Sequence, residues 1–119
     1  MVEPRLKTDI WVKALIRRCA VEAVFAAVVR HGDNSSGSTL VKVNRLNGSA
    51  YVLTPARQMS GEGIWIRGTG PQDVSEADAD AYITRSISYD PDLWVIEIED
   101  RAGRHFLLDA VEGEGKNKV

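Results

Sequence analysis

The residues with the strongest chemical character are one cysteine, two histidines and a pair of aspartates. Cys19 could be a nucleophile, but a reactive thiolate needs solvent exposure and a cationic neighbour. A helical wheel places Cys19 in the middle of an apolar stripe, which indicates a buried, inert thiol. His31, His105 and the pair Asp90 and Asp92 are residue types that a small hydrolase uses. A small hydrolase is therefore one functional hypothesis, which we rank third, after a protein-binding function and a phosphate- or nucleic-acid-binding function.

The segment His31–Ser38 combines histidine, aspartate, glycine and serine in one polar loop. These residues are adjacent in sequence, whereas a catalytic triad needs residues that converge from different elements. The Gly and Ser amides could cradle a phosphate, yet the loop lacks the Gly-Lys-Ser/Thr ending of a P-loop. Two histidines without a paired metal-ligand spacing give no metal motif. We predict a plain hairpin loop, no metal, no cofactor and no catalytic residue.

Basic side chains gather near the N-terminus, where they could attract phosphate groups. They lack the base-reading or stacking side chains of a recognisable nucleic-acid module. Trp65 is opposite in phase to Ile64 and Ile66, so we expect Trp65 to be exposed and available to a partner. The candidate partner-binding residues are thus Arg5, Lys7, Lys13, Arg17 and Trp65.

The net charge of −2 hides an asymmetry between the two halves of the chain. Residues 1–67 carry ten Lys and Arg against five Asp and Glu, and residues 68–119 carry five against twelve. In one compact domain, this pattern can mean that basic and acidic strands neutralise each other. It can also mean a dipolar surface with a charged partner.

The length of 119 residues predicts one domain, which we place at residues 1–110, followed by a disordered Gly/Glu/Lys tail at residues 111–119. The N-terminus has no secretory signal, and the longest apolar run, Ala23–Val29, is too short to span a bilayer. A single cysteine cannot form an internal disulfide. We expect a cytoplasmic protein that does not contact a membrane.

Two segments have the pattern of β-hairpins with a glycine bulge in the turn. In Thr39–Pro55, placing Gly48 at the bulge pairs Val43 with Tyr51 and Val41 with Leu53. In Asp90–Leu108, placing Gly103 at the bulge aligns a second apolar face. The pairs there are Asp100 with Arg104, Glu99 with His105, Ile98 with Phe106, and Ile96 with Leu108.

The remaining elements are two helices and two further strands. A helix capped by Thr8 should stop before Glu22, because that side chain would fall inside its buried stripe. Val24–Arg30 is apolar on both faces and reads as a central strand, with a continuation of the helix to Arg30 as the alternative. A strand at Gly63–Arg67 and a helix from Glu76 to about Ile87, capped by Ser75, complete the set.

These elements predict an α+β fold with an antiparallel sheet of five to six strands and two helices. The expected order is α-β-β-β-β-α-β-β, with both helices on one face of the sheet.

Several motifs carry a resemblance to a known family. They are PRLKTDIWV at Pro4–Val12, RHGD at Arg30–Asp33, LVKVN at Leu40–Asn44 and DPDLWVIEIED at Asp90–Asp100. Together they resemble the alphaproteobacterial domain-of-unknown-function (DUF) family number 1491. The resemblance covers most of residues 4–108 and is least clear over residues 58–81. It implies one compact domain in a bacterial cytoplasm and carries no activity, cofactor or catalytic residue with it.

The leading functional hypothesis is therefore a non-catalytic module that binds another protein, or a second copy of itself along a sheet edge. The alternative, from another class, is a phosphate- or nucleic-acid-binding protein that uses the basic N-terminal arm and first helix.

Overall fold

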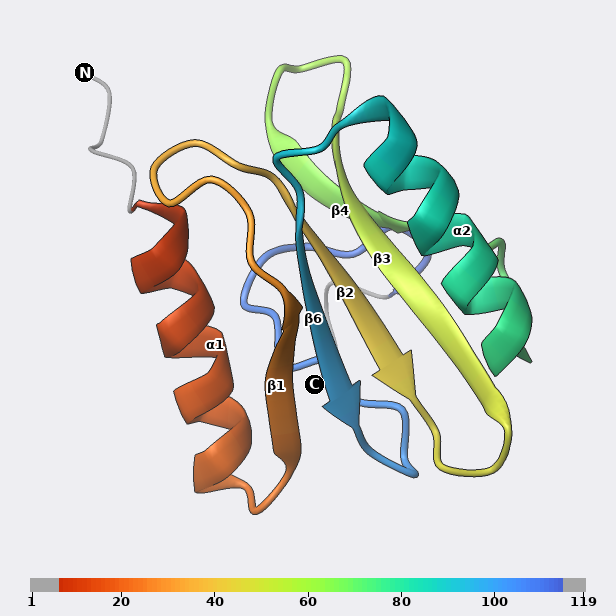
Figure 1. Cartoon of the computed structure of the whole chain (residues 1–119). Coiled ribbons are helices and arrows are strands. Elements are labelled where there is room, and N and C mark those ends of the chain that lie inside the picture. The colour runs from red at the N-terminus through yellow and green to blue at the C-terminus, as the bar shows by residue number, and fades with distance from the viewer. Residues whose placement is uncertain (1–6, 115–119) are drawn as a thin grey trace.

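The computed structural model describes residues 7–114, so Arg5 and residues 115–119 lie outside the described part of the chain. Two helices and six strands follow one another along these residues (Figure 1). In chain order they are α1 (Thr8–Val21), β1 (Phe25–Arg30), β2 (Thr39–Asn44), β3 (Ser49–Arg57), β4 (Gly63–Arg67), β5 (Val74–Ser75), α2 (Glu76–Tyr89) and β6 (Trp94–Glu99).

The strands form one sheet in the spatial order β1-β6-β2-β3-β4, and the short β5 pairs with β3. Every pairing is antiparallel except that of β2 with β6, which is parallel. This arrangement confirms the predicted α+β class and its largely antiparallel sheet of six strands.

The β2–β3 hairpin has the predicted register, with Val43 opposite Tyr51 and Val41 opposite Leu53. Gly48 has the positive φ of 89° that the turn requires, and the Arg45 amide donates to the Ser49 carbonyl at 3.0 Å. Local turn chemistry and alternating side chains were therefore sufficient to predict this pairing.

Helix α1 ends at Val21, as the position of Glu22 predicted. The break needs no glycine, because Ala23 itself takes a φ of 60°. The strand interpretation of the next segment is confirmed, and the continued helix is wrong. Two details differ from our predictions: Lys7 occupies the N-cap, since the Thr8 hydroxyl donates to the Gly37 carbonyl, and β1 lies at the edge of the sheet.

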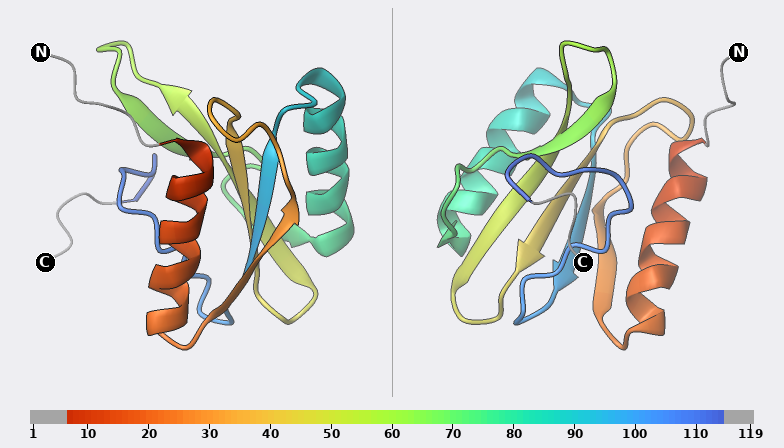
Figure 2. Two further views of the ribbon diagram at one scale, coloured as in Figure 1. Left: turned by 60° about the vertical axis from the view of Figure 1, so that its left-hand side comes forward. Right: turned by 180° about the vertical axis from the view of Figure 1, so that it is seen from behind.

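The two helices cover opposite faces of the sheet, so the prediction that they share one face is wrong (Figure 2). The α1 face buries Trp94, Ile96 and Ile98 of β6 beneath the helix, and the α2 face buries Val95 and its neighbours. Both clusters draw on alternate residues of the same strands, because successive side chains of a strand point to opposite faces. The buried α1 residues are Val12, Leu15 and Cys19, and those of α2 are Ala79 and Ile83.

Helix α2 begins at its predicted cap, where the Asp78 amide donates to the Ser75 hydroxyl at 3.0 Å. It ends at Tyr89, just before Asp90 and Pro91. The residue before a proline disfavours helical geometry, which explains this boundary.

The predicted hairpin at Asp90–Leu108 is wrong beyond its turn. β6 has β1 on one side and β2 on the other, so it has no free edge for a returning strand. The turn itself forms: Gly103 has a φ of 78°, and its amide donates to the Asp100 carbonyl. The following residues then cross the α1 face of the sheet without forming a strand in the described chain.

The segment after the turn reaches the outer edge of β4. There the Trp65 amide donates to the Ala110 carbonyl at 2.9 Å, and the Glu112 amide donates to the Trp65 carbonyl at 2.8 Å. Val111 between them is only 6% exposed. The described chain therefore packs against β4 as far as Glu112, one residue past the position where we place the start of the tail.

Candidate functional site

One edge of the sheet is bare. β1 pairs with β6 on its inner side, and no strand within residues 7–114 pairs with its outer side. Phe25 is 62% exposed and Val29 is 60% exposed on this strand, although both are large apolar residues. Unpaired main-chain groups beside exposed apolar side chains form a surface that favours association with another chain.

The local sequence explains why β1 is an edge strand with two different faces. Ala26 and Val28 lie opposite Ile98 and Ile96, on the face that α1 covers. Phe25 lies opposite Glu99, on the face that α1 does not reach. A β-bulge between Val28 and Arg30 ends the regular pairing. Sequence reasoning read the apolar residues on both faces as a sign of a central strand, so the edge was not predicted.

The opposite edge of the sheet is closed by the chain itself. Trp65 of β4 is only 7% exposed, so the prediction of an exposed tryptophan is wrong. Its ring stacks on that of Trp11 with centroids 5.7 Å apart and an angle of 14°. Trp65 is buried because α1 and the C-terminal segment cover its face of β4. The alternation with Ile64 and Ile66 had led us to expect that the opposite face of this strand was the buried one. Ile64 and Ile66 are half-buried.

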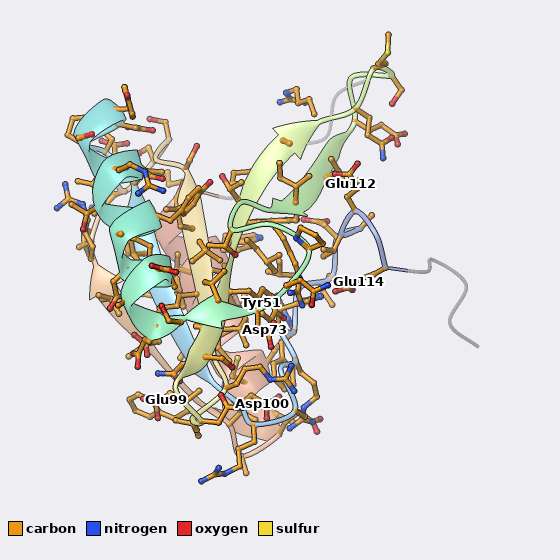
Figure 3. The ribbon with its side chains drawn as sticks, turned by 90° about the vertical axis from the view of Figure 1, so that its right-hand side faces the viewer. Tyr51, Asp73, Glu99, Asp100, Glu112 and Glu114 are labelled. Atoms are coloured by element: carbon orange, nitrogen blue, oxygen red, sulfur yellow. The ribbon has the colours of Figure 1, made fainter. Side chains whose placement is uncertain are left out.

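The C-terminal segment is fastened to the sheet by polar contacts around Tyr51 (Figure 3). The Tyr51 hydroxyl donates to the Gly103 carbonyl at 2.6 Å, and the Arg67 guanidinium lies 3.7 Å above its ring. Burial raises the pKa of Tyr51 to about 12, so the hydroxyl remains a donor. Asp100 accepts hydrogen bonds from the Arg104 side chain and amide, and these bonds lower the pKa of its carboxyl.

The predicted partner-binding residues do not form one surface. Lys13 and Arg17 lie on the exposed side of α1, while Lys7 lies at its N-terminus. Lys7 and Trp65 line a hollow of about 970 Å³ between α1, the loop before β2 and the β3–β4 hairpin, and Lys13 and Arg17 are not part of its lining. Arg5 lies outside the described residues.

The loop from His31 to Ser38 is not a hairpin loop, because β6 lies between β1 and β2. The Asp33 carboxylate accepts hydrogen bonds from the amides of Ser35 and Ser36, so these amides do not offer a free phosphate cradle. The Trp94 indole donates to the Asp33 carbonyl at 2.7 Å. These hydrogen bonds therefore fix the conformation of the loop that connects β1 to β2.

The candidate catalytic residues remain apart. Cys19 is fully buried, and burial raises the pKa of its thiol. His31 packs on Trp94 with ring centroids 3.9 Å apart. His105 pairs with Glu114 at 3.1 Å, and its Nδ1 accepts from the Leu107 amide, so the predicted pairing with Glu99 is wrong.

No hydrogen bond within the described residues joins a cysteine or serine nucleophile to a histidine. Asp90 and Asp92 are linked to each other, because the Asp92 amide donates to the Asp90 carboxylate at 3.1 Å. Residues 7–114 also contain no group of three or more His, Cys, Asp or Glu side chains placed to hold a metal ion.

A buried lysine is the feature that sequence reasoning missed. Lys42 of β2 is 3% exposed, and its Nζ lies 2.9 Å from Glu76, 2.8 Å from Asp80 and 3.6 Å from Glu97. Asn44 donates to both Glu76 and Glu97. Burial lowers the pKa of Lys42, but the hydrogen bonds and charges of the carboxylates outweigh it and raise the pKa overall. The β2–β3 register puts Lys42 and Asn44 on the same face of the sheet, but the local sequence does not show that α2 lies above them.

Comparison with known proteins gives a consistent result. A family model described as "Protein of unknown function (DUF1491)" matches residues 6–108. No curated protein matches the chain. In the part that the structure describes, no helix is both long and apolar enough to cross a membrane.

The chain is also similar to solved structures. A crystal structure of a DUF1491 family protein from Caulobacter crescentus shares 48% identity and a TM-score of 0.82, covering 91% of this chain and all of that one. An NMR structure of a DUF1491 family protein from the same organism shares 46% identity, with a TM-score of 0.81 over 93% of this chain and all of that one. A solution structure from A. tumefaciens shares 28% identity, with a TM-score of 0.76 over 94% of this chain and all of that one.

Proposed function

The chain belongs to the DUF1491 family, and we propose that it is a non-catalytic protein-interaction module that binds a second copy of itself through β1. The observation that carries this proposal is the bare apolar edge of β1 beside a sheet whose other edge is covered. Monomeric proteins protect edge strands with charges, prolines, bulges or covering segments. In β1, only the bulge and Arg30 at its end provide such protection.

A second copy fits this edge because the contact can be symmetric. Two antiparallel β1 strands related by a two-fold axis present the same surface to each other, which closes the assembly as a dimer. The sheet then continues from one subunit into the next through main-chain hydrogen bonds, each worth about 1 kcal/mol net. Burial of Val29 would add the apolar contribution that an exposed strand lacks.

The non-catalytic part of the proposal is supported by the separation of the candidate catalytic residues. Cys19 is inaccessible, and the two histidines contact Trp94 and Glu114 rather than a nucleophile. A cytoplasmic location also belongs to this proposal, because the single cysteine is a free thiol.

Sedimentation equilibrium of the wild-type protein and of a Val29→Lys variant tests the proposal. We expect a dimer for the wild type and a monomer for Val29→Lys, because lysine on an edge strand opposes pairing. Met59→Lys is the matched control, since Met59 is fully exposed in the β3–β4 loop, and it should remain dimeric. A wild-type protein that stays monomeric at its highest soluble concentration contradicts the proposal.

A further inference from the structure

The α2 face of the sheet is only partly covered. Helix α2 packs on β3 and β2, and its cluster also buries Val95 of β6 and the preceding Leu93, but it does not reach β1 (Figure 1). Phe25 and Ala27 of β1 lie on this open side, opposite Glu99 and Glu97 of β6. We call these four residues the acidic shelf. It combines the exposed Phe25 and the half-buried Ala27 of β1 with the carboxylates of Glu97 and Glu99 on β6.

The acidic shelf continues into an excess of negative charge at the start of α2. Glu76, Asp80 and Glu97 share the single cation of Lys42, and Asn44 adds hydrogen bonds but no charge. The side chains of Asp80 and Glu76 are 58% and 44% exposed, whereas that of Glu97 is 20% exposed. Three carboxylates around one ammonium group leave a net negative charge that an approaching cation can neutralise.

We propose that the acidic shelf docks a basic amphipathic segment of a partner protein. Apolar side chains of that segment would cover Phe25 and Ala27, and its lysines or arginines would meet Glu97, Glu99 and Asp80. Charge complementarity of this kind selects the partner and accelerates its association. The proposal goes beyond self-association, because the shelf consists of side chains on a sheet face and leaves the main-chain edge of β1 free.

A second copy of the chain carries the required chemistry but in an unsuitable place. Ile10, Lys13, Arg17 and Val21 recur on the outer side of α1, and all four are exposed. However, α1 and the shelf lie on opposite faces of the sheet. Contact between them would be head-to-tail and would build a ring or an open chain instead of a two-fold pair. A different protein is therefore the occupant to which the proposal commits.

The test uses a fluorescent peptide of about 14 residues, with leucine and lysine at helical spacing, titrated with the full-length protein. Anisotropy should report binding that weakens as salt rises. Glu99→Lys and Phe25→Ser should each weaken binding about tenfold, because one reverses a shelf charge and the other removes its largest apolar contact. Glu62→Lys is the control, because it changes the net charge as much as Glu99→Lys does but lies in the β3–β4 loop, away from the shelf. The affinity of this variant for the peptide should stay within about twofold of the wild-type value.

Three outcomes would overturn the proposal. The peptide does not bind, Glu62→Lys weakens binding as much as Glu99→Lys, or the protein forms salt-sensitive chains that Lys13→Glu abolishes. The last result would identify α1 of a second copy as the occupant. Sedimentation measured in parallel separates the two proposals, because a dimer that ignores the peptide contradicts only the shelf, and a monomer that binds it contradicts only the self-association.

Discussion

The two edges of the sheet are treated differently by the same chain. At β4, Ala110–Glu112 pair with Trp65 and cover its main chain, and the tryptophan is buried against Trp11. At β1, no described segment performs this role, and Phe25 is largely exposed. The C-terminal segment thus protects the β4 edge from pairing with other chains, whereas no described segment protects the β1 edge. The bare β1 edge is therefore where we expect a partner strand.

The largest effect should come from replacing the aromatic residue of the covered edge. Trp65→Ala should reduce the free energy of unfolding by about 4 kcal/mol, because it empties a buried site between α1 and the C-terminal segment. Phe25→Ala at the bare edge should cost less than about 1 kcal/mol in the dissociated protein. Urea unfolding at low protein concentration measures both changes. Equal losses would mean that the two edges are equally buried.

Removing the C-terminal segment that covers β4 should leave the β4 edge as exposed as the β1 edge. A chain that ends at Leu108 lacks Val111 and two main-chain hydrogen bonds to Trp65, which together stabilise the fold by about 3 kcal/mol. We expect a red shift of tryptophan emission and new self-association through β4. A chain that ends at Glu114 is the control and should behave like the full-length protein. Unchanged association of the shorter chain would show that edge exposure alone does not drive pairing.

A smaller effect should follow from loosening the turn before that segment. Asp100→Asn should cost about 1.5 kcal/mol at pH 7, since it removes the charge that Arg104 binds. The pKa of Asp100 is lowered in the folded protein, so its stabilising effect is complete above the unfolded pKa and is lost as the pH falls further. The difference between variant and wild type should therefore shrink below about pH 4 in acid unfolding experiments. A difference that is constant with pH would contradict an ionic role for Asp100.

What the sequence could predict depended on the distance between partners. The β2–β3 pairing followed from Gly48 and the alternating residues beside it, because strand neighbours in space are also neighbours in sequence there. β6 has the same local pattern, yet it pairs with β1 and in parallel with β2, both far away along the chain. Its local turn at Gly103 gave no sign of this competition.

The same reason explains the errors at the candidate site. The apolar residues of β1 are compatible with a central or an edge strand, and only the placement of β6 decides between them. Trp65 was assigned to solvent from the two isoleucines beside it, while the residues that bury it come from α1 and the C-terminal segment. Lys13 and Arg17 are exposed on α1, and a helical wheel is enough to place them there because it needs no information from distant segments.

Hydrogen exchange across a protein concentration series tests the central claim most directly, because it reports on individual amides of each edge. The β1 amides that no described residue binds should exchange more slowly as the concentration rises and β1 strands pair. The Trp65 and Glu112 amides, already bonded within one chain, should keep the same rate. Exchange in β1 that does not change with concentration, in a protein shown to be dimeric, would contradict pairing through this edge.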